Sequence, residues 1–138
     1  MSENFQNKEN KSKLEEGTGL NLQFDKSGGL LPVVVQEQKS GEILMLGYTN
    51  EEAFEHTRKH NLATFWSRSR RELWVKGETS GNRLHVREIR VDCDQDALVY
   101  IVKLEGEGAC HTKNNESEFR KSCFYRKVDT SKQNLIYD

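Results

Sequence analysis

Three aspartates alternate with other residues in the run VDCDQDA, residues 91–97. In an extended strand, successive side chains point to opposite faces, so Asp92, Asp94 and Asp96 would share one face. Cys93 would then point to the other face. Carboxylate oxygens are hard ligands that suit Mg²⁺, whereas a thiolate is a soft ligand that suits Zn²⁺. If the run is extended, it therefore predicts two metal sites, sorted by ligand chemistry.

The aspartate run has other interpretations. Aspartates at the end of a strand also form solvated turns that bind no metal. A calcium loop of the EF-hand type is excluded, because Ala97 stands where the turn glycine belongs and Lys103 where the bidentate glutamate belongs. A magnesium site and a metal-free turn remain open as alternatives.

Two more cysteines follow in the segments GACHT and SCFYR. Together, Cys93, Cys110 and Cys123 supply the three protein ligands of a catalytic zinc, which keeps a water in its open position. Free cysteines are also common as small buried hydrophobes, and the spacings of 17 and 13 residues contain no Cys-x-x-Cys signature. Three roles remain open for His111: a fourth zinc ligand, a general acid or base, or an exposed loop histidine without a function in the site.

A third stretch, WSRSRRELWVKGETSGN at 66–82, mixes basic and hydroxyl side chains with glycines and two tryptophans. Arginine and hydroxyl groups bind phosphate oxygens, and a glycine-rich turn exposes backbone N–H groups to an anion. The same composition is typical of a solvated strand face over a tryptophan core, or of binding to single-stranded nucleic acid. By itself the stretch does not decide between these.

Strands dominate the elements that must position these residues. Segments rich in apolar, β-branched and aromatic residues predict strands at 30–35, 43–46, 63–66, 73–76, 84–91, 97–104 and 123–128. The first two are expected to form a hairpin. The capping-box pattern at Thr49–Glu52 predicts one helix that runs to His60. Its buried side should carry Ala53, Phe54 and Thr57.

The totals predict one domain at 19–128, with a flexible polar tail at 1–18 and a polar C-terminal tail at 129–138. A net charge of -1, from 21 basic and 22 acidic residues, provides no field that would draw the chain to nucleic acid or a membrane. The absence of a secretory signal or membrane-spanning run favours a cytoplasmic protein. An odd number of cysteines argues against a disulfide framework.

Taken together and in order, WSRSRRELWVKGETSGN, DCDQDALVYIV, and GACHT with SCFYR resemble the hallmark segments of the phosphoribosyl-AMP cyclohydrolase family. The resemblance spans about residues 30–128. It implies a monofunctional hydrolase of histidine biosynthesis that opens the N1–C6 bond of the adenine in 1-(5-phosphoribosyl)-AMP. The product would be the phosphoribosyl-formimino-AICAR-phosphate intermediate of the third step. The implied fold is a compact, strand-rich α+β domain with one main helix, in an intertwined homodimer.

The resemblance also implies two metal cofactors, with zinc shared across the homodimer. Cys93 of one subunit and Cys110 and Cys123 of its partner would bind Zn²⁺, and Asp92, Asp94 and Asp96 would bind Mg²⁺. A zinc-bound hydroxide would attack C6 of the adenine with Mg²⁺ assistance, and His111 is the proposed proton carrier. The residues expected to hold the phosphates of the nucleotide substrate are Arg68, Ser69, Lys76, Thr79 and Ser80.

The chain departs from the family pattern between its last two cysteines. The family usually has a Cys-His-Thr-Gly-x-x-Ser-Cys run, whereas here residues 113–121 separate Thr112 from Ser122, which adds six residues. Doubling a loop's length costs only about 0.6 kcal/mol of closure entropy, so the longer loop is compatible with the site.

Two alternatives to an active cyclohydrolase follow. In one, the chain is a non-catalytic module that binds a nucleotide or RNA and has a structural zinc, with His111 as its fourth ligand. In the other, the chain is a cyclohydrolase disabled by the insertion. The few residues after Val128 also predict that a second, pyrophosphohydrolase domain is absent.

Overall fold

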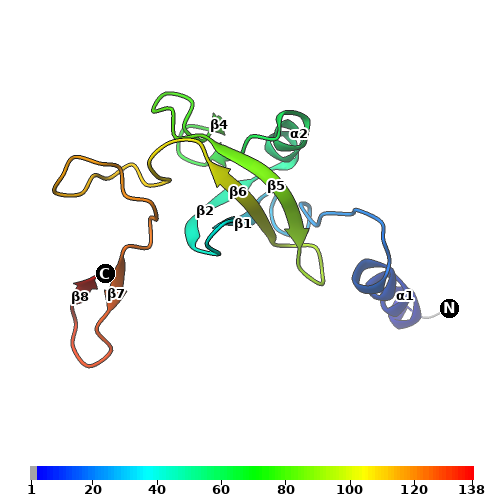
Figure 1. The fold of residues 1–138 in the computed structure, drawn as a ribbon. Coiled ribbons are helices and arrows are strands. Elements are labelled where there is room, and N and C mark those ends of the chain that lie inside the picture. Colours follow the sequence, from blue (N-terminus) through cyan, green and yellow to red (C-terminus); the bar gives the residue numbers. More distant parts are fainter. Residues whose placement is uncertain (1–2) are drawn as a thin grey trace.

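The computed structural model describes residues 3–138, with side chains in the first helix described from residue 8 onward. Its centre is a four-stranded mixed sheet in the order β2-β1-β6-β5 (Figure 1). These strands are β1 (Leu31–Glu37), β2 (Ile43–Thr49), β5 (Leu84–Val91) and β6 (Leu98–Leu104). The hairpins β1–β2 and β5–β6 are antiparallel, and β1 joins them by pairing in parallel with β6.

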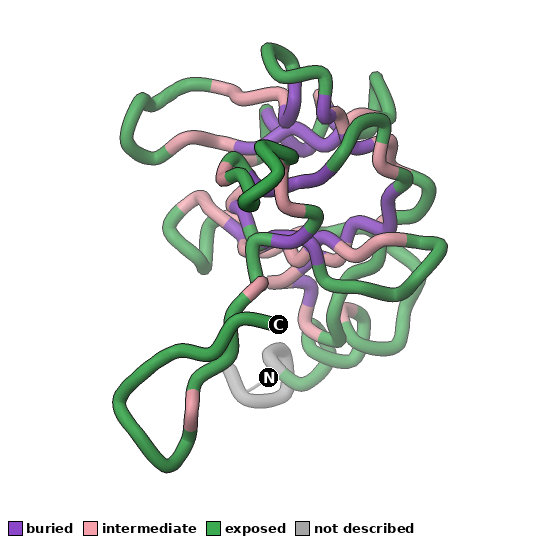
Figure 2. Tube along the Cα trace, turned by 60° about the vertical axis from the view of Figure 1, so that its left-hand side comes forward, coloured by how far each residue is buried: buried purple, intermediate pink, exposed green. Residues whose placement is uncertain are grey.

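The hydrophobic core lies against one face of this sheet. Leu31, Val33 and Val35 alternate with more exposed residues along β1 and are fully buried, as the period of a strand requires. Tyr100 and Val102 of the neighbouring β6 are buried as well. Figure 2 shows these buried segments gathered in the middle of the molecule. The predicted hairpin and the strands at 84–91 and 97–104 are thus confirmed.

The predicted helix is present as α2 (Glu51–His60), and its buried residues are those expected from the sequence, Ala53, Phe54 and Thr57. Its cap differs from the prediction. The side chain of Asn50, and not that of Thr49, accepts a hydrogen bond from the Ala53 N–H at 2.8 Å. Thr49 is the last residue of β2 and is fully buried, so it cannot also cap the helix.

A second hairpin, β3 (Thr64–Ser67) with β4 (Glu72–Val75), packs through β3 against β2 and α2. Gly47 of β2 makes this packing possible, because a Cβ there would lie 2.7 Å from the Phe65 ring. The α+β class is confirmed by these sheets and two helices.

The two ends of the chain form elements outside the central sheet. Helix α1 (Glu3–Glu16) and the hairpin β7 (Arg126–Val128) with β8 (Leu135–Tyr137) lie well apart in Figure 1. The strand predicted at 123–128 is therefore shorter, and the predicted polar tail at 129–138 includes the strand β8. Residues 1–2 of the predicted N-terminal tail lie outside the described residues, and the division into tails and a domain at 19–128 stays a prediction.

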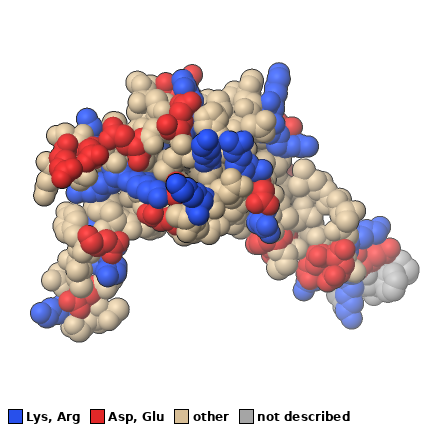
Figure 3. Space-filling view, in the orientation of Figure 1, with Lys and Arg blue, Asp and Glu red and all other residues tan. Residues whose placement is uncertain are grey.

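Charges of both signs are interspersed over the molecular surface. Figure 3 shows Lys and Arg side chains beside Asp and Glu across the face that it draws. The many exposed pairs, such as Arg83 with Glu105 at 3.0 Å, account for part of this mixture. Among the described residues, no helix is both long and apolar enough to cross a membrane.

Candidate metal and active site

The aspartate run forms a tight turn between β5 and β6. The backbone N–H of Asp92 donates to the Ala97 carbonyl at 3.1 Å, and the side chain of Asp92 accepts from the N–H groups of Asp96 and Ala97 at 3.0 and 3.1 Å. Gln95 has a φ of 55°, which lies outside the strand region. The condition of an extended run with alternating faces is therefore not met, and the turn that the sequence left open as an alternative is present, because these residues connect two antiparallel strands.

The turn nevertheless brings the three carboxylates together. One oxygen from each of Asp92, Asp94 and Asp96 lies within 4.8 Å of the others. Hydrogen bonding to Asp94 and Asp92 raises the pKa of Asp96, and the same contact with Asp96 lowers the pKa of Asp94. The Lys26 ammonium lies 3.9 Å from Asp94 and 3.7 Å from Asp96. Three converging hard oxygens fit a small divalent cation.

Gln95 ties the N-terminal segment to the aspartate turn. Its buried side chain accepts from the Asn21 N–H at 2.8 Å and donates to the carbonyls of Gly19 and Leu14 at 3.1 and 3.2 Å. Its backbone carbonyl accepts from the Gln23 N–H at 2.9 Å. Sequence reasoning missed the contacts of Gln95 with the N-terminal segment and the approach of Lys26 to the carboxylates. No local sequence pattern pairs residues that lie more than sixty positions apart.

The segment that carries Cys110 forms a two-stranded ribbon with the inserted residues. The N–H groups of Ala109 and Cys110 donate to the carbonyls of Lys121 and Arg120 at 2.9 and 3.1 Å. The Arg120 N–H donates in return to the Thr112 carbonyl at 3.0 Å. The ribbon absorbs the extra residues at its tip, so the insertion leaves its two ends side by side.

Two features shape this ribbon. At the tip, the Asn114 side chain accepts from the N–H groups of Glu116 and Glu118 at 2.9 and 3.0 Å, which closes the turn. At the base, a Cβ on Gly108 would lie 2.3 Å from the Arg120 carbonyl oxygen, so only glycine permits this close approach.

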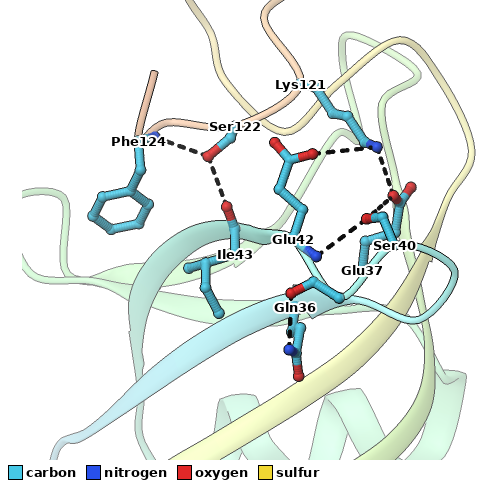
Figure 4. A network of polar contacts seen from close by, with 9 residues as sticks. Gln36, Glu37, Ser40, Glu42, Ile43, Lys121, Ser122 and Phe124 are labelled. Carbon is cyan, nitrogen blue, oxygen red and sulfur yellow. Dashed lines mark hydrogen bonds and ion pairs between the residues drawn. The ribbon is translucent and has the colours of Figure 1, made fainter. Parts of the chain in front are cut away.

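Cys123 and its two chain neighbours are attached to the β1–β2 hairpin. Figure 4 shows Ser122 between Phe124 and Ile43 of β2. The Cys123 N–H donates to the Leu44 carbonyl at 2.7 Å, and the Ser122 hydroxyl donates to the Ile43 carbonyl at 2.7 Å. The Phe124 N–H donates to the same Ser122 oxygen at 2.9 Å. These bonds fix the backbone of Cys123 to β2, whatever the length of the preceding loop.

An ion-pair network strengthens this attachment. The Lys121 ammonium lies 2.6 Å from Glu37 and 3.4 Å from Glu42, at the two ends of the β1–β2 turn (Figure 4). Ser40 donates to Glu37 at 2.5 Å within the same turn. The hydrogen bond that Lys121 donates to Glu37 lowers the pKa of Glu37 and raises that of Lys121. The end of the insertion is thus anchored where it meets Ser122.

As a result, the side chains of Cys110 and Cys123 lie close enough for each to shift the pKa of the other. Burial raises the pKa of the Cys123 thiol to about 11, although the residue as a whole is exposed, and the neighbouring Cys110 adds to this increase. Burial also acts to raise the pKa of Cys110, but hydrogen bonds from Thr112 and the neighbouring Cys123 outweigh it and lower the pKa. Lys76 lies near enough to both sulfurs for their charges to act on its pKa, and burial lowers that pKa nonetheless.

Cys93 lies apart from this pair, exposed in the aspartate turn. Within residues 3–138, the aspartates form the one group of three or more potential metal ligands that converge. Thiolates are soft ligands, so the pair formed by Cys110 and Cys123 fits a soft metal such as zinc. A three-thiolate site is incomplete within a single chain.

The residues predicted to bind phosphate occupy two places. Arg68 and Ser69 lie in the β3–β4 turn, where the Arg68 guanidinium stacks 4.1 Å from the Tyr48 ring centroid. Lys76, Thr79 and Ser80 follow the other end of β4. Since a strand rises about 3.3 Å per residue, the four residues of β4 hold the backbones of the two groups roughly 13 Å apart.

His111 is exposed in the loop between Cys110 and Thr112. Its ring makes no hydrogen bond to any described residue, so it is accessible to solvent and to a ligand. The sequence singled out His111 only through its position next to Cys110. The structure leaves its role as a proton carrier a prediction.

Comparisons with known proteins agree with the motifs. The family model described as phosphoribosyl-AMP cyclohydrolase matches residues 45–125. The Solibacter usitatus protein of that name is 50% identical over 123 residues, which cover 86% of this chain and 93% of the relative. The Archaeoglobus fulgidus protein of the same name is 54% identical over 110 residues, covering 80% and 94%. An Aquifex aeolicus protein named "Histidine biosynthesis bifunctional protein HisIE" is 44% identical, and the match covers 52% of it.

Proposed function

This chain belongs to the phosphoribosyl-AMP cyclohydrolase family, and we propose that it opens the adenine ring of 1-(5-phosphoribosyl)-AMP at the N1–C6 bond, in the cytoplasm, as a step of histidine biosynthesis. The observation that carries the proposal is the convergence of Cys110 and Cys123, whose side chains lie close enough to shift each other's pKa. The insertion lengthens the loop between these cysteines, yet the ribbon and the β1–β2 hairpin bring them together. This argues against a cyclohydrolase disabled by its insertion.

Cys110 and Cys123 of one subunit would hold zinc together with Cys93 of the other. Support comes from the exposure of Cys93, away from the other two thiols, and from the softness of the donors. When bound, zinc would supply the Lewis acidity that makes water nucleophilic near neutral pH. Lys76 lies beside the thiols, where its ammonium offsets their negative charge.

His111 is the candidate for moving the proton of the attacking water. An imidazole titrates near neutral pH, so it can take a proton from water and pass it to the leaving nitrogen. Its exposed position next to Cys110 gives it access to both the site and solvent. Replacing His111 by alanine should lower turnover and leave zinc bound, whereas unchanged turnover would rule out this role.

The two separated basic groups suit a substrate that carries two phosphates. Arg68 and Ser69 would bind one phosphate, and Lys76, Thr79 and Ser80 would bind the other. The turn at 76–82 supports the second group, because Gly77 has a φ of 80° and a Cβ there would lie 2.2 Å from the Asn82 backbone. The Asp92, Asp94 and Asp96 cluster would bind Mg²⁺, which orients the substrate or stabilises developing charge.

The homodimer is supported by apolar side chains that one chain leaves exposed. Phe124 and Tyr137 are 55% and 64% exposed, and Val128 is 69% exposed. They lie on or next to the β7–β8 hairpin, which projects from the central body (Figure 1). Large exposed apolar groups of this kind mark association surfaces. A second copy would cover them and supply the missing cysteine.

The test is hydrolysis of phosphoribosyl-AMP by the purified protein, followed by ultraviolet absorbance, with and without a zinc chelator. The proposal predicts turnover that the chelator and a Cys123→Ala substitution both abolish. Absence of turnover in protein loaded with zinc and magnesium would overturn it. A cobalt-substituted sample separates catalysis from a purely structural metal, because a catalytic site keeps an exchangeable water ligand.

A further inference from the structure

Arg120 lies near the end of the loop 113–121, two positions before Ser122, and reaches back to the ligand pair. Its guanidinium Nη1 donates to the Thr112 hydroxyl oxygen at 3.2 Å. That hydroxyl oxygen lies 2.9 Å from the Cys110 sulfur, and the Thr112 N–H also points to this sulfur at 3.4 Å. Arg120, Thr112 and Cys110 therefore form a continuous chain of polar contacts.

The chemistry of the hydroxyl group gives this chain a direction. An arginine only donates, so the Thr112 oxygen must accept from it. The single hydroxyl proton of Thr112 is then free to donate to the Cys110 sulfur. The positive charge of Arg120 polarises the hydroxyl and strengthens this second bond. The arrangement suits a sulfur that carries negative charge, as a metal ligand does.

Aromatic rings hold the guanidinium in place. It lies 4.1 Å from the centroid of the Tyr125 ring and 5.7 Å from that of the Tyr137 ring, distances at which cation–π attraction acts. Tyr137 belongs to β8, and the Asp138 N–H donates to the Tyr125 carbonyl at 3.2 Å. The C-terminal hairpin thus fixes Arg120, and Arg120 is partly buried there.

We propose that Arg120 is a positioning residue of the zinc site: through Thr112 it orients the Cys110 sulfur toward the metal, and the aromatic rings of the C-terminal hairpin keep it aligned. This role rests on the proposed zinc-dependent function. Residues that hydrogen-bond to a metal ligand or its partner typically change metal affinity by about 10–100-fold.

The chain offers a matched control. The Arg126 guanidinium lies 5.0 Å from the same Tyr125 ring, but it makes no hydrogen bond to Thr112 among the described residues. Arg126→Met removes a cation from the same aromatic surface and leaves the polar chain to Cys110 intact. A general loss of stability or charge would affect both variants, whereas loss of positioning would affect only Arg120→Met.

The experiment measures zinc affinity of the full-length protein by competition with a chromophoric chelator, together with the cobalt(II) thiolate absorption spectrum. Arg120→Met should weaken zinc binding by about 10-fold and shift the cobalt spectrum. Arg120→Lys, which keeps one donor and the charge, should recover part of the loss, and Arg126→Met should match the unaltered protein. Zinc affinity and a cobalt spectrum unchanged in Arg120→Met would overturn the proposal.

A double-mutant cycle tests whether Arg120 acts through Thr112. In a Thr112→Val background, Arg120→Met should weaken zinc binding little further, because the shared hydroxyl is already absent. Fully additive losses would contradict a path through Thr112. If the unaltered protein hydrolyses its substrate with zinc while Arg120→Met binds zinc normally, only the Arg120 role fails. If the unaltered protein binds no zinc, the proposed zinc site fails and the Arg120 role with it.

Discussion

The aspartate turn and the cysteine pair are built in different ways. The turn gathers its three carboxylates from residues 92–96, and the Asp92 side chain closes it with two backbone hydrogen bonds. The cysteine pair joins residues 110 and 123 through a ribbon, an attachment to β2 and an ion-pair network. The first site is local and complete in one chain, whereas the second depends on tertiary contacts and lacks a third thiol.

This difference explains how the chain accommodates its insertion. A local turn of this kind has no room for added residues, because each one would move a carboxylate. The ribbon accepts them at its tip, since its base is fixed on both sides by backbone hydrogen bonds. Tolerance to insertion is therefore a property of the attachment points and not of the loop length.

The largest expected effect tests whether the cysteine site spans two subunits. Cys93→Ser and Cys110→Ser should each abolish turnover as homodimers. Mixing them under exchange conditions should restore about one quarter of the normal activity, because half of the dimers are hybrids and each hybrid has one intact site. Ultraviolet assays of the mixture measure this recovery. No recovery, in samples shown to exchange subunits, would place all three ligands in one chain.

The aspartate turn should separate metal binding from stability. Asp92→Ala and Asp94→Ala should both weaken Mg²⁺ binding, as measured by calorimetry. Only Asp92→Ala should also lower the melting temperature, by the equivalent of roughly 1 kcal/mol, because it removes two hydrogen bonds that close the turn and water replaces them only in part at this exposed site. Asp92→Asn, which keeps an oxygen acceptor, is the control. Equal melting temperatures for Asp92→Ala and Asp94→Ala would show that the turn does not need this side chain.

Lys26 should compete with a cation for the carboxylates. Its ammonium lies 3.7 Å from Asp96, where it already offsets part of the negative charge. Lys26→Met should therefore raise the Mg²⁺ affinity by about 3-fold at low ionic strength, with a smaller gain at high salt. Lys11→Met, which removes a lysine paired with Glu15 on α1, is the matched control. An affinity unchanged at low salt would exclude competition.

The smallest expected effect concerns the ion pair beside Cys123. Lys121→Met should destabilise the fold by roughly 0.5 kcal/mol at neutral pH, a value reduced by solvent screening because Lys121 is 42% exposed. The pKa of Glu37 lies below its ordinary value of 4.5, so the pair stabilises the fold above that pH. The stabilisation is lost as the pH falls through the lowered pKa.

Denaturant titrations of the Lys121→Met variant and the unaltered protein at several pH values check this dependence. The difference in unfolding free energy should shrink below pH 4.5. Lys127→Met, which removes an exposed pair with Asp138 at 3.6 Å, should show a smaller difference throughout. A difference for Lys121→Met that grows as the pH falls would contradict the assignment to Glu37.

The sequence by itself determined the elements and the chemistry that they carry. Segments rich in apolar, β-branched and aromatic residues predicted β1, β2, β5 and β6, and helix α2 was predicted with its buried face, since local propensity and packing agree there. The three motifs identified the family, and the ligand types that they indicate stay predictions. These features depend on neighbouring residues, which a linear pattern records.

Only the tertiary structure decided how the motifs come together. The sequence left open whether the run at 91–97 is extended or a turn, because its alternation does not distinguish the two until the pairing of β5 with β6 is known. The contact of Cys110 with Cys123, the approach of Lys76 to both, and the bond from Arg120 to Thr112 depend on ribbon register and docking. Such contacts depend on which backbone N–H groups pair with which carbonyls across the fold. The spacing of residues in the sequence does not specify this pairing.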